Sequence, residues 1–351
     1  MSRICIIPQA SNVGGVTSFQ RKLAAGLARR GVEVCHDLGD MPYEAVLLTG
    51  GTRQLLGLWQ AKQRGVPILQ RLDGINWIHR QRRTGWRHYL RAEYGNRLLA
   101  LVRARLASRI VYQSEFVRGW WEDWFGAGRV PSVVIHNGVD LQMYSPVGQI
   151  ANLPVGQIGN LSYRLLIVEG SLGGGYDLGL EWAVRLAELL TDRVGAAQKH
   201  KFPLELMIIG RLSPDLQTEW QNRSRVPILW AGTVPGERIP EIDRSAHLLF
   251  SADLNSACPN SVIEALACGL PVVSFSTGAL PELVTGDAGR LVPYGGNPWR
   301  IEPPDLPGLA AAAAGILADL PRFRSAARAR AEAAFSLARM VDKYLDVLLG
   351  K

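Results

Sequence analysis

Short apolar runs of strand length alternate with stretches of helical periodicity through most of the chain. Between residues 17 and 30, for example, Leu23 and Leu27 lie one helical turn apart, and Gly31 follows where helices commonly end. Apolar runs separated by helices in this way predict parallel strands with helices on both faces. In the first half, the predicted strands cover residues 4–8, 32–34, 45–48, 67–72, 109–113 and 132–136.

The alternation stops near the middle of the chain and then restarts. The octet at 147–154, Val-Gly-Gln-Ile-Ala-Asn-Leu-Pro, is nearly repeated at 155–162 and shows little periodicity. We interpret 147–163 as a duplicated linker between an N-terminal domain at 1–146 and a C-terminal domain at 164–335. In the second domain, the predicted strands cover 164–168, 204–209, 228–231, 247–251 and 271–275, and the predicted helices include 178–191, 240–244 and 259–267.

These patterns predict an α/β protein of two Rossmann-like, doubly wound domains, which suits a length of 351 residues. No apolar run approaches the ~18–20 residues that a membrane span needs. The chain enters an apolar strand at once, without a leader peptide, so we expect a cytoplasmic protein. The four cysteines and six histidines show no metal-ligand or redox spacing, so we predict neither a metal nor another cofactor.

The net charge of +8 belongs entirely to the first half of the chain. Residues 1–146 contain 20 Lys and Arg against 10 Asp and Glu, and eleven of the arginines lie between Arg80 and Arg129, among several Trp and Tyr. Arginine with tryptophan suits an anionic membrane surface, which predicts a peripheral membrane protein. A solvated helix face above core tryptophans remains the alternative. Nucleic acid is a third interpretation, which the donor-site segment described next disfavours.

The segment from residue 251 to 274 has the pattern of a strand, a loop, a short helix and a buried strand. Pro259 suits the first turn of a helix, and Gly269 ends it. The amides near Asn260 and Ser261 are then unpaired donors at a positive dipole end, which favours a diphosphate. Glu264 lies one turn further, where its carboxylate could accept hydrogen bonds from a ribose hydroxyl pair.

This segment resembles the donor-binding segment of family-4 GT-B glycosyltransferases, the glycosyl transferases group 1. In that family an acidic residue, seven others and a Glu precede Ala-Leu/Met-Ala-Cys-Gly-Leu-Pro-Val-Val, and here Glu264 precedes Ala-Leu-Ala-Cys-Gly-Leu-Pro-Val-Val. Further similarities are Gly14-Gly15 before a helix, Tyr112-Gln-Ser-Glu-Phe-Val, Asn137-Gly-Val-Asp, Thr277-Gly-Ala-Leu-Pro-Glu-Leu-Val and Gly289-Arg-Leu-Val. The resemblance spans both domains in the expected order.

The resemblance implies two domains facing each other across a cleft, with the C-terminal helix at 336–351 packing back on the first domain. It implies a retaining, metal-independent glycosyltransferase of the hexosyltransferase class. The enzyme would move a sugar from a nucleotide-diphosphate sugar to a hydroxyl of a glycan or lipid-linked acceptor. By position, Glu264 would hold the donor ribose, and the backbone at Pro259, Asn260 and Ser261 would approach the donor sugar and phosphate. Gly14 and Gly15 would permit close approach of the backbone, because glycine has no Cβ.

The sequence departs from the family pattern at two places. Ser256 stands eight residues before Glu264, where the family has Glu or Asp, so we predict that its hydroxyl contacts the donor sugar. Asp253 could take this role only if the loop shifts. The family's Arg and Lys after the first strand of the second domain are missing from 169–177. Because a leaving diphosphate needs stabilisation, we expect Arg211, with Arg290 behind it, or the Gly173–Gly175 amides to replace them.

A polar cluster follows the strand that ends near residue 72 of the first domain. Open α/β sheets bind ligands at the carboxyl ends of their strands, so Arg71, Asp73 and Asn76 are candidates for the acceptor site. We include His79 as a candidate catalytic base, with a satisfied loop histidine as the alternative. The catalytic candidates are thus Ser256, Glu264 and His79.

Other functions remain open at this point. The missing cations and Ser256 also fit a catalytically weak or inactive relative that binds sugar nucleotides without transfer. A nucleotide-sugar 2-epimerase is another alternative, but the sequence has no paired acidic and histidine set for proton abstraction.

Overall fold

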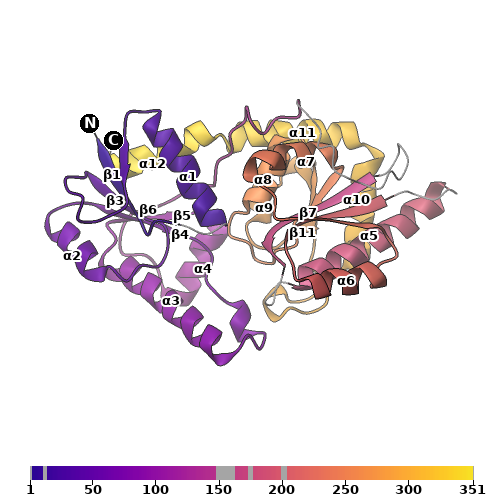
Figure 1. Ribbon diagram of the computed structural model, residues 1–351, viewed down its shortest axis with the longest axis horizontal. Helices are drawn as coiled ribbons and strands as arrows, with labels where there is room; N and C mark the ends of the chain where they lie inside the picture. The colour runs from indigo at the N-terminus through magenta and orange to yellow at the C-terminus, as the bar shows by residue number, and fades with distance from the viewer. Residues whose placement is uncertain (1, 11–13, 148–162, 173–176, 199–203, 351) are drawn as a thin grey trace. The chain divides into compact units, whose positions relative to one another are not determined.

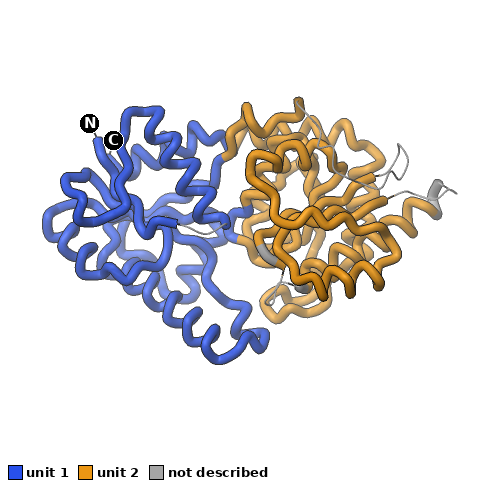
Figure 2. The backbone as a smooth tube through the Cα atoms, viewed as in Figure 1, with its two compact units in different colours: residues 1–138, 257–259, 335–351 blue, residues 139–256, 260–334 orange. Residues whose placement is uncertain are grey.

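The computed structural model describes the chain except residues 1, 11–13, 148–162, 173–176, 199–203 and 351, and the described part forms two compact α/β units (Figures 1 and 2). Unit 1 comprises 1–138, 257–259 and 335–351, and unit 2 comprises 139–256 and 260–334. Each unit contains one six-stranded sheet, and every strand pair with a described register is parallel. The predicted α/β class with two doubly wound sheets is therefore confirmed.

The sheet of unit 1 has the strand order β2-β1-β3-β4-β5-β6. Alternate residues of β1 face opposite layers: Ile4 and Ile6 pack with α1 and α12, whereas Cys5 and Ile7 pack with α2 and α3. The strands are β1 (Arg3–Ile7), β2 (Glu33–Cys35), β3 (Ala45–Leu48), β4 (Ile68–Leu72), β5 (Arg109–Tyr112) and β6 (Ser132–Val134). The helices are α1 (Gly15–Ala28), α2 (Leu55–Gln63), η1 (Ile78–Arg80), α3 (Trp86–Arg105), α4 (Glu115–Phe125) and α12 (Leu337–Leu349).

The sheet of unit 2 has the order β12-β11-β10-β7-β8-β9. Its largest core cluster joins β7, β8, β10 and β11 to helices α5 and α10. The strands are β7 (Tyr163–Ser171), β8 (Leu204–Arg211), β9 (Ile228–Gly232), β10 (Leu248–Phe250), β11 (Val272–Phe275) and β12 (Gly289–Val292). The longer helices are α5 (Asp177–Gln198), α6 (Pro214–Arg223), α7 (Ile239–Ser245), α8 (Asn260–Ala267), α9 (Leu280–Leu283), α10 (Leu306–Ala318) and α11 (Leu320–Ala334).

Each sheet reverses its direction of growth at one point. In unit 2 the chain adds β8 and β9 on one side of β7 and then returns to add β10, β11 and β12 on the other. In unit 1 the reversal lies between β1 and β3. Two neighbouring loops leave a sheet in opposite directions at such a point, and this opens a crevice at the carboxyl ends where ligands bind.

The units differ in extent from the domains expected from the sequence. The segment 257–259 lies within the predicted C-terminal domain but packs as part of unit 1, together with 335–351. Most of the predicted linker, 148–162, lies outside the described residues. Helix α8 begins at Asn260, one residue after the predicted start at Pro259. Among the helices of the described chain, none is long and apolar enough to cross a bilayer.

Helix α12 packs against the end of β6 through Gly138. A Cβ at Gly138 would lie 2.8 Å from Leu337 Cα, a backbone atom that cannot move without shifting the helix. We therefore expect Gly138→Ala to lower the free energy of unfolding by about 1–3 kcal/mol, as overpacking does. Gly119→Ala in α4 is the control, because nothing lies within 4 Å of its Cβ position and alanine favours helix. Denaturant unfolding checks both variants, and equal effects would contradict the packing argument.

Candidate functional site

The switch point of unit 2 lies between β7 and β10, and an acidic residue stands at the carboxyl end of each strand. Glu169 is near the end of β7, and Asp253 follows β10. The ladder between β7 and β8 is irregular between Val168 and Ser171, as β-bulges beside functional sites often are. Gly210 accommodates this irregularity: its φ is +148°, and a Cβ there would lie 2.5 Å from the carbonyl oxygen of Glu169.

The two carboxyl groups hold protons more tightly than usual. Removal from water, with the nearby carboxylate of Asp253, raises the pKa of Glu169 to about 8, although the Ala252 N–H donates a hydrogen bond to it. Removal from water likewise raises the pKa of Asp253 to about 6. Glu169 therefore keeps its proton to a higher pH than an exposed glutamate does, and in the protonated form it can donate a hydrogen bond.

The loop after Asp253 is held in one conformation by the loop that follows β11. Asn255 has a φ of +55°, and a Cβ at Gly278 would lie 2.5 Å from the backbone nitrogen of Ser256, so only glycine fits there. The Ala279 N–H donates to the Ser256 carbonyl at 2.9 Å. The Ser256 hydroxyl and the Asn255 amide nitrogen are both buried without a hydrogen-bond partner among the described residues. Such groups gain free energy when a ligand supplies the missing bond.

Helix α8 places its N-terminus directly after this loop and carries Glu264 on its buried side. Asn260 and Ser261 form the first turn and are partly exposed, whereas Glu264 is buried. Asp243 of α7 is close enough to interact with Glu264. Removal from water, with that neighbouring charge, raises the pKa of Asp243 well above its usual range. Both carboxyl oxygens of Asp243 lack hydrogen-bond partners within the described chain. The sequence reasoning did not identify Asp243.

Arg211 is an exposed residue at the carboxyl end of β8, in register with Ser171 of β7. It therefore stands beside the end of the strand that carries Glu169. Arg290 is already engaged, since it forms an ion pair with Asp287 at 2.8 Å and covers the Phe323 ring. Gly173 lies outside the described residues, as do Gly174 and Gly175.

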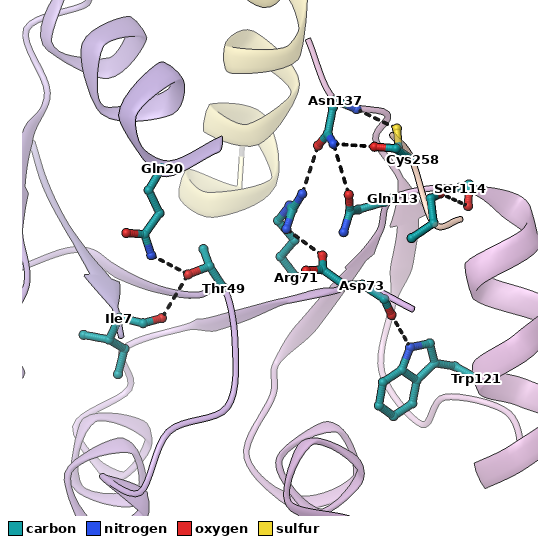
Figure 3. Close-up of polar contacts among 11 residues, drawn as sticks. Ile7, Gln20, Thr49, Arg71, Asp73, Gln113, Ser114, Trp121, Asn137 and Cys258 are labelled. Atoms are coloured by element: carbon teal, nitrogen blue, oxygen red, sulfur yellow. Dashed lines mark hydrogen bonds and ion pairs between the residues drawn. The ribbon is translucent and has the colours of Figure 1, made fainter. Parts of the chain in front are cut away.

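Pro259 belongs to the three-residue segment Ala257–Pro259, which packs in unit 1. Figure 3 shows the polar contacts of Cys258, the middle residue of this segment. The Asn137 side-chain amide donates to the Cys258 carbonyl at 2.9 Å, and the Asn137 backbone N–H donates to the Cys258 sulfur at 3.3 Å. The Ser114 hydroxyl donates to the Ala257 carbonyl at 2.7 Å. Asn137 had been noted only as part of the Asn-Gly-Val-Asp similarity, and no periodicity marked Ser114 as a partner of this segment.

Arg71 and Asp73 form an ion pair at the carboxyl end of β4. The Arg71 guanidinium is almost fully buried, donates to Asp73 Oδ1 at 2.7 Å and to Asn137 Oδ1 at 2.9 Å, and stacks on Phe19 at 3.9 Å. The Asp73 carbonyl accepts a hydrogen bond from the indole nitrogen of Trp121 at 2.8 Å. These contacts hold Arg71 inside the unit, and the side chain of Asp73 is 39% exposed.

Asn76 and His79 lie further along the same loop. Asn76 is held by Asn96 of α3, whose side-chain oxygen accepts from the Asn76 backbone N–H at 3.1 Å. The His79 ring is buried and lies 2.9 Å from Glu93 Oε1. The Arg80 guanidinium, which binds the same carboxylate, lowers the pKa of Glu93 to about 2. This geometry supports an anchoring role for His79; its catalytic role stays a prediction.

Gly14 caps the N-terminus of α1 with a φ of +159°, and a Cβ there would meet nothing within 4 Å. Gly15, the first residue of α1, is exposed. At the nearby switch point, the buried Gln20 side chain donates to the Thr49 hydroxyl at 2.6 Å (Figure 3). It also donates to the Pro8 carbonyl at 2.7 Å. The backbone at the start of α1 is therefore open to a ligand.

The candidate residues fall into two groups, one in each unit. Unit 2 carries Ser256, Asn260, Ser261, Glu264 and Arg211 on loops and a helix that follow the carboxyl ends of its strands. Unit 1 carries Gly14, Gly15, Arg71, Asp73, Asn76, His79 and, through its inserted segment, Pro259. In the described part of the chain, no three His, Cys, Asp or Glu side chains gather where they could hold a metal ion. Metal independence stays a prediction.

The basic tract, the arginine-rich stretch from Arg80 to Arg129 with its neighbouring aromatic residues, contributes some side chains to the core and exposes others. Trp77, Trp120 and Trp121 are buried, and Arg103 is buried in hydrogen bonds with the Tyr112 hydroxyl and the Gly126 carbonyl. The exposed part is one face of α3, on which Trp86 (70% exposed), Leu90 (58%), Tyr94 (57%) and Leu101 (45%) recur at helical spacing. Exposed arginines accompany this α3 face at positions 83, 87, 91 and 97.

Comparison with protein families matches residues 167–319 to the family described as glycosyl transferases group 1. The match contains the acidic pair of the switch point, the 251–256 loop and all of α8. Comparison with curated proteins gave no match.

Several solved structures resemble the whole chain. The sucrose-phosphate synthase of Thermosynechococcus elongatus has a TM-score of 0.70 at 16% identity, covering 99% of this chain and 98% of its own. HepE from Anabaena, solved with UDP and glucose, has a TM-score of 0.68 at 16% identity and full coverage of both chains. WaaG, a glycosyltransferase involved in lipopolysaccharide biosynthesis, has a TM-score of 0.73 at 13% identity, covering 99% of this chain and 100% of its own. The chain has the GT-B fold.

The raised pKa of Glu169, which faces Asp253, predicts how the stability of the protein depends on pH. Since the folded state raises the pKa of Glu169 from 4.5 to about 8, folding binds a proton in that window, and stability falls as pH rises through it. Glu169→Gln should flatten this dependence. Thermal unfolding across pH 5–9 would measure this effect.

Glu205→Gln is the matched control, because Glu205 is a buried acid of the same unit that pairs with Arg164 instead. It should retain the fall of stability with rising pH. If the profile of the Glu169→Gln protein follows that of the unaltered protein, Glu169 does not titrate at the site.

Proposed function

We propose that this protein is a retaining, metal-independent glycosyltransferase that transfers a hexose from a nucleotide-diphosphate sugar to an acceptor hydroxyl. The observation that carries the proposal is the 251–264 stretch beside the switch point of unit 2. In this stretch, a loop held in one conformation carries buried polar groups that have no partner among the described residues, and a helix N-terminus is followed by a buried glutamate. These features lie within the part of the chain that matches the glycosyl transferases group 1.

In the proposed reaction, unit 2 binds the donor. The N-terminal amides of α8 receive the diphosphate, Glu264 accepts hydrogen bonds from the ribose hydroxyls, and Ser256 contacts a hydroxyl of the sugar. The bond from the anomeric carbon to the diphosphate oxygen breaks, and the acceptor oxygen bonds to that carbon on the same face. The acceptor proton passes to the departing diphosphate, so no protein base is required for this step.

Charge on the departing diphosphate has to be stabilised without the usual pair of cations. We assign this role to Arg211, which is exposed at the end of β8, together with the α8 amides. Because HepE has been solved with UDP-glucose, uridine diphosphate sugars are the first donors to test. A relative that binds the donor without transferring it is the second candidate, favoured by the missing cations and the acidic pair.

For unit 1 we propose acceptor binding by Asp73 and Asn76, with a glycan or lipid-linked sugar as the acceptor, and with buried Arg71 orienting the Asp73 carboxylate. We also propose that the protein is cytoplasmic and attaches peripherally to an anionic membrane through the exposed α3 face. Tryptophan and tyrosine partition to the headgroup level of a bilayer, and arginine pairs with anionic headgroups. Glu93, the one acidic residue of α3, is paired with the Arg80 guanidinium, so no unpaired carboxylate of α3 opposes this contact.

Donor binding provides the first test. UDP or UDP-glucose should raise the thermal unfolding temperature equally with and without EDTA. Glu264→Gln should weaken UDP binding about tenfold or more, because it replaces charge-assisted hydrogen bonds with neutral ones. Glu188→Gln is the control, since Glu188 is a buried glutamate of α5 that pairs with Arg185. A glycan-transfer assay with UDP-glucose then separates an active enzyme from a binding-only relative.

If no nucleotide or nucleotide sugar shifts the unfolding temperature, the donor-site assignment is wrong. Equal weakening by the Glu264 and Glu188 variants would show that the loss arises from damaged packing.

Membrane attachment has its own test. The protein should sediment at low salt with vesicles of equimolar phosphatidylglycerol and phosphatidylcholine, and should be released by salt. The double variant Trp86→Ser, Leu90→Ser should bind these vesicles about tenfold less, as expected from the apolar area it removes. The control, Leu56→Ser with Trp59→Ser, changes exposed apolar residues of α2 and should bind normally. Failure to sediment at low salt would exclude this attachment.

A further inference from the structure

The segment Ala257–Pro259 interrupts unit 2 in the sequence but belongs to unit 1 in its contacts. Ser256, immediately before it, and Asn260, immediately after it, are both donor-site candidates of unit 2. The segment is therefore the stretch of backbone that joins the 251–256 loop to the N-terminus of α8. Whatever holds these three residues also restrains where the first amides of α8 point.

Asn137 holds the Ala257–Pro259 segment through hydrogen bonds from both its side chain and its backbone (Figure 3). Its side-chain nitrogen has two hydrogens, which go to the Cys258 carbonyl at 2.9 Å and to Gln113 Oε1 at 3.2 Å. Its backbone N–H donates to the Cys258 sulfur at 3.3 Å. Since the residue is buried, water cannot replace these bonds when the side chain moves.

Arg71 determines which way the Asn137 amide faces. A guanidinium only donates, so its contact at 2.9 Å requires the oxygen of the amide on that side and leaves the nitrogen directed toward Cys258. Arg71 is itself oriented by Asp73 and by the Phe19 ring. The orientation of the amide is thus imposed by a charged group that cannot rotate freely.

Ser114 supplies a second hold on the same segment. Its hydroxyl oxygen accepts from the Val117 N–H at 3.2 Å and so caps α4, while its hydrogen goes to the Ala257 carbonyl at 2.7 Å. Gly74 leaves room beside Ala257, because a Cβ on Gly74 would lie 3.7 Å from the Ala257 Cβ and 2.9 Å from the Trp120 ring. Consecutive carbonyls of the segment are therefore bonded from two different elements of unit 1.

We propose that Asn137, oriented by Arg71, and Ser114 are positioning residues of the donor site. They hold Ala257–Pro259 so that the backbone continuing into α8 presents its amides to the donor diphosphate. This inference rests on the proposed function. It assigns to unit 1 residues a part in donor binding, whereas the donor candidates Ser256, Asn260 and Glu264 belong to unit 2.

The sharpest variant is Asn137→Asp. It retains the size of the side chain and the contact with Arg71, but it replaces the donating nitrogen by an oxygen that faces the Cys258 carbonyl. We expect the Kd for UDP, measured by calorimetry, to rise about tenfold as one buried hydrogen bond becomes a repulsion. We also expect alkylation of Cys258 by iodoacetamide, followed by peptide mass spectrometry, to become about tenfold faster, with Cys5 and Cys268 unchanged as internal references.

Ser114→Ala is the second variant, with Ser336→Ala as its matched control. Both remove an N-cap within unit 1, from α4 and α12 respectively, but Ser114 also bonds Ala257. The two should lose similar thermal stability, and only Ser114→Ala should weaken UDP binding and expose Cys258.

Unchanged UDP affinity in a folded Asn137→Asp protein would overturn the positioning role, even if Cys258 becomes accessible. Equal weakening by Ser114→Ala and Ser336→Ala would overturn it as well, since the effect would follow stability. If the unaltered protein binds neither UDP nor UDP-glucose, both the proposed function and this inference are wrong. If the unaltered protein binds UDP and the variants bind it equally well, only the inference is wrong.

Discussion

The parallel arrangement of the strands is the constraint from which the other features follow. In a parallel sheet every strand ends at the same edge, so residues that follow different strands are brought together without being close in sequence. Glu169 and Asp253 are 84 positions apart in numbering, yet they interact because β7 and β10 are neighbours in the sheet. The same constraint brings Arg71 of β4 to Asn137, which follows β6.

The electrostatics of the two units differ at these edges. In unit 1, the buried charge of Arg71 is matched by Asp73 and by amide oxygen, so the site carries a partnered cation. In unit 2, Glu169 and Asp253 interact with no cationic partner among the described residues, and the pKa of each carboxyl group is raised. The resembling family has Arg and Lys to meet a diphosphate, and the proposed donor site of this chain offers the α8 backbone amides and Arg211 instead. That difference sets apart its proposed donor chemistry.

The fold was predictable from the sequence because apolar runs and helical periodicity report burial directly. The strand that escaped prediction, β12, is four residues long and starts at a glycine whose Cβ would lie 2.1 Å from the Val272 carbonyl. The 251–264 stretch was recognisable from its turn and helix signals.

The anchoring of Cys258 by Asn137 was not predictable, since it joins positions 121 residues apart through hydrogen bonds that leave no periodic trace. The pairing of Glu169 with Asp253 was not predicted either, because only the pairing of β7 with β10 in the sheet brings these two residues together. The division of the basic tract into core tryptophans and one exposed helix face required knowledge of which side of α3 faces the sheet.

The path of the chain limits how this protein could be recombined. The backbone passes from one unit to the other after residues 138, 256, 259 and 334. In a chimaera joined within residues 147–163, the 257–259 segment would come from the second parent. Its partners Asn137 and Ser114 would come from the first. Evolution of a new donor specificity by exchange of halves would therefore require the two parents to share this pairing, which makes the three-residue segment a marker of compatibility between lineages.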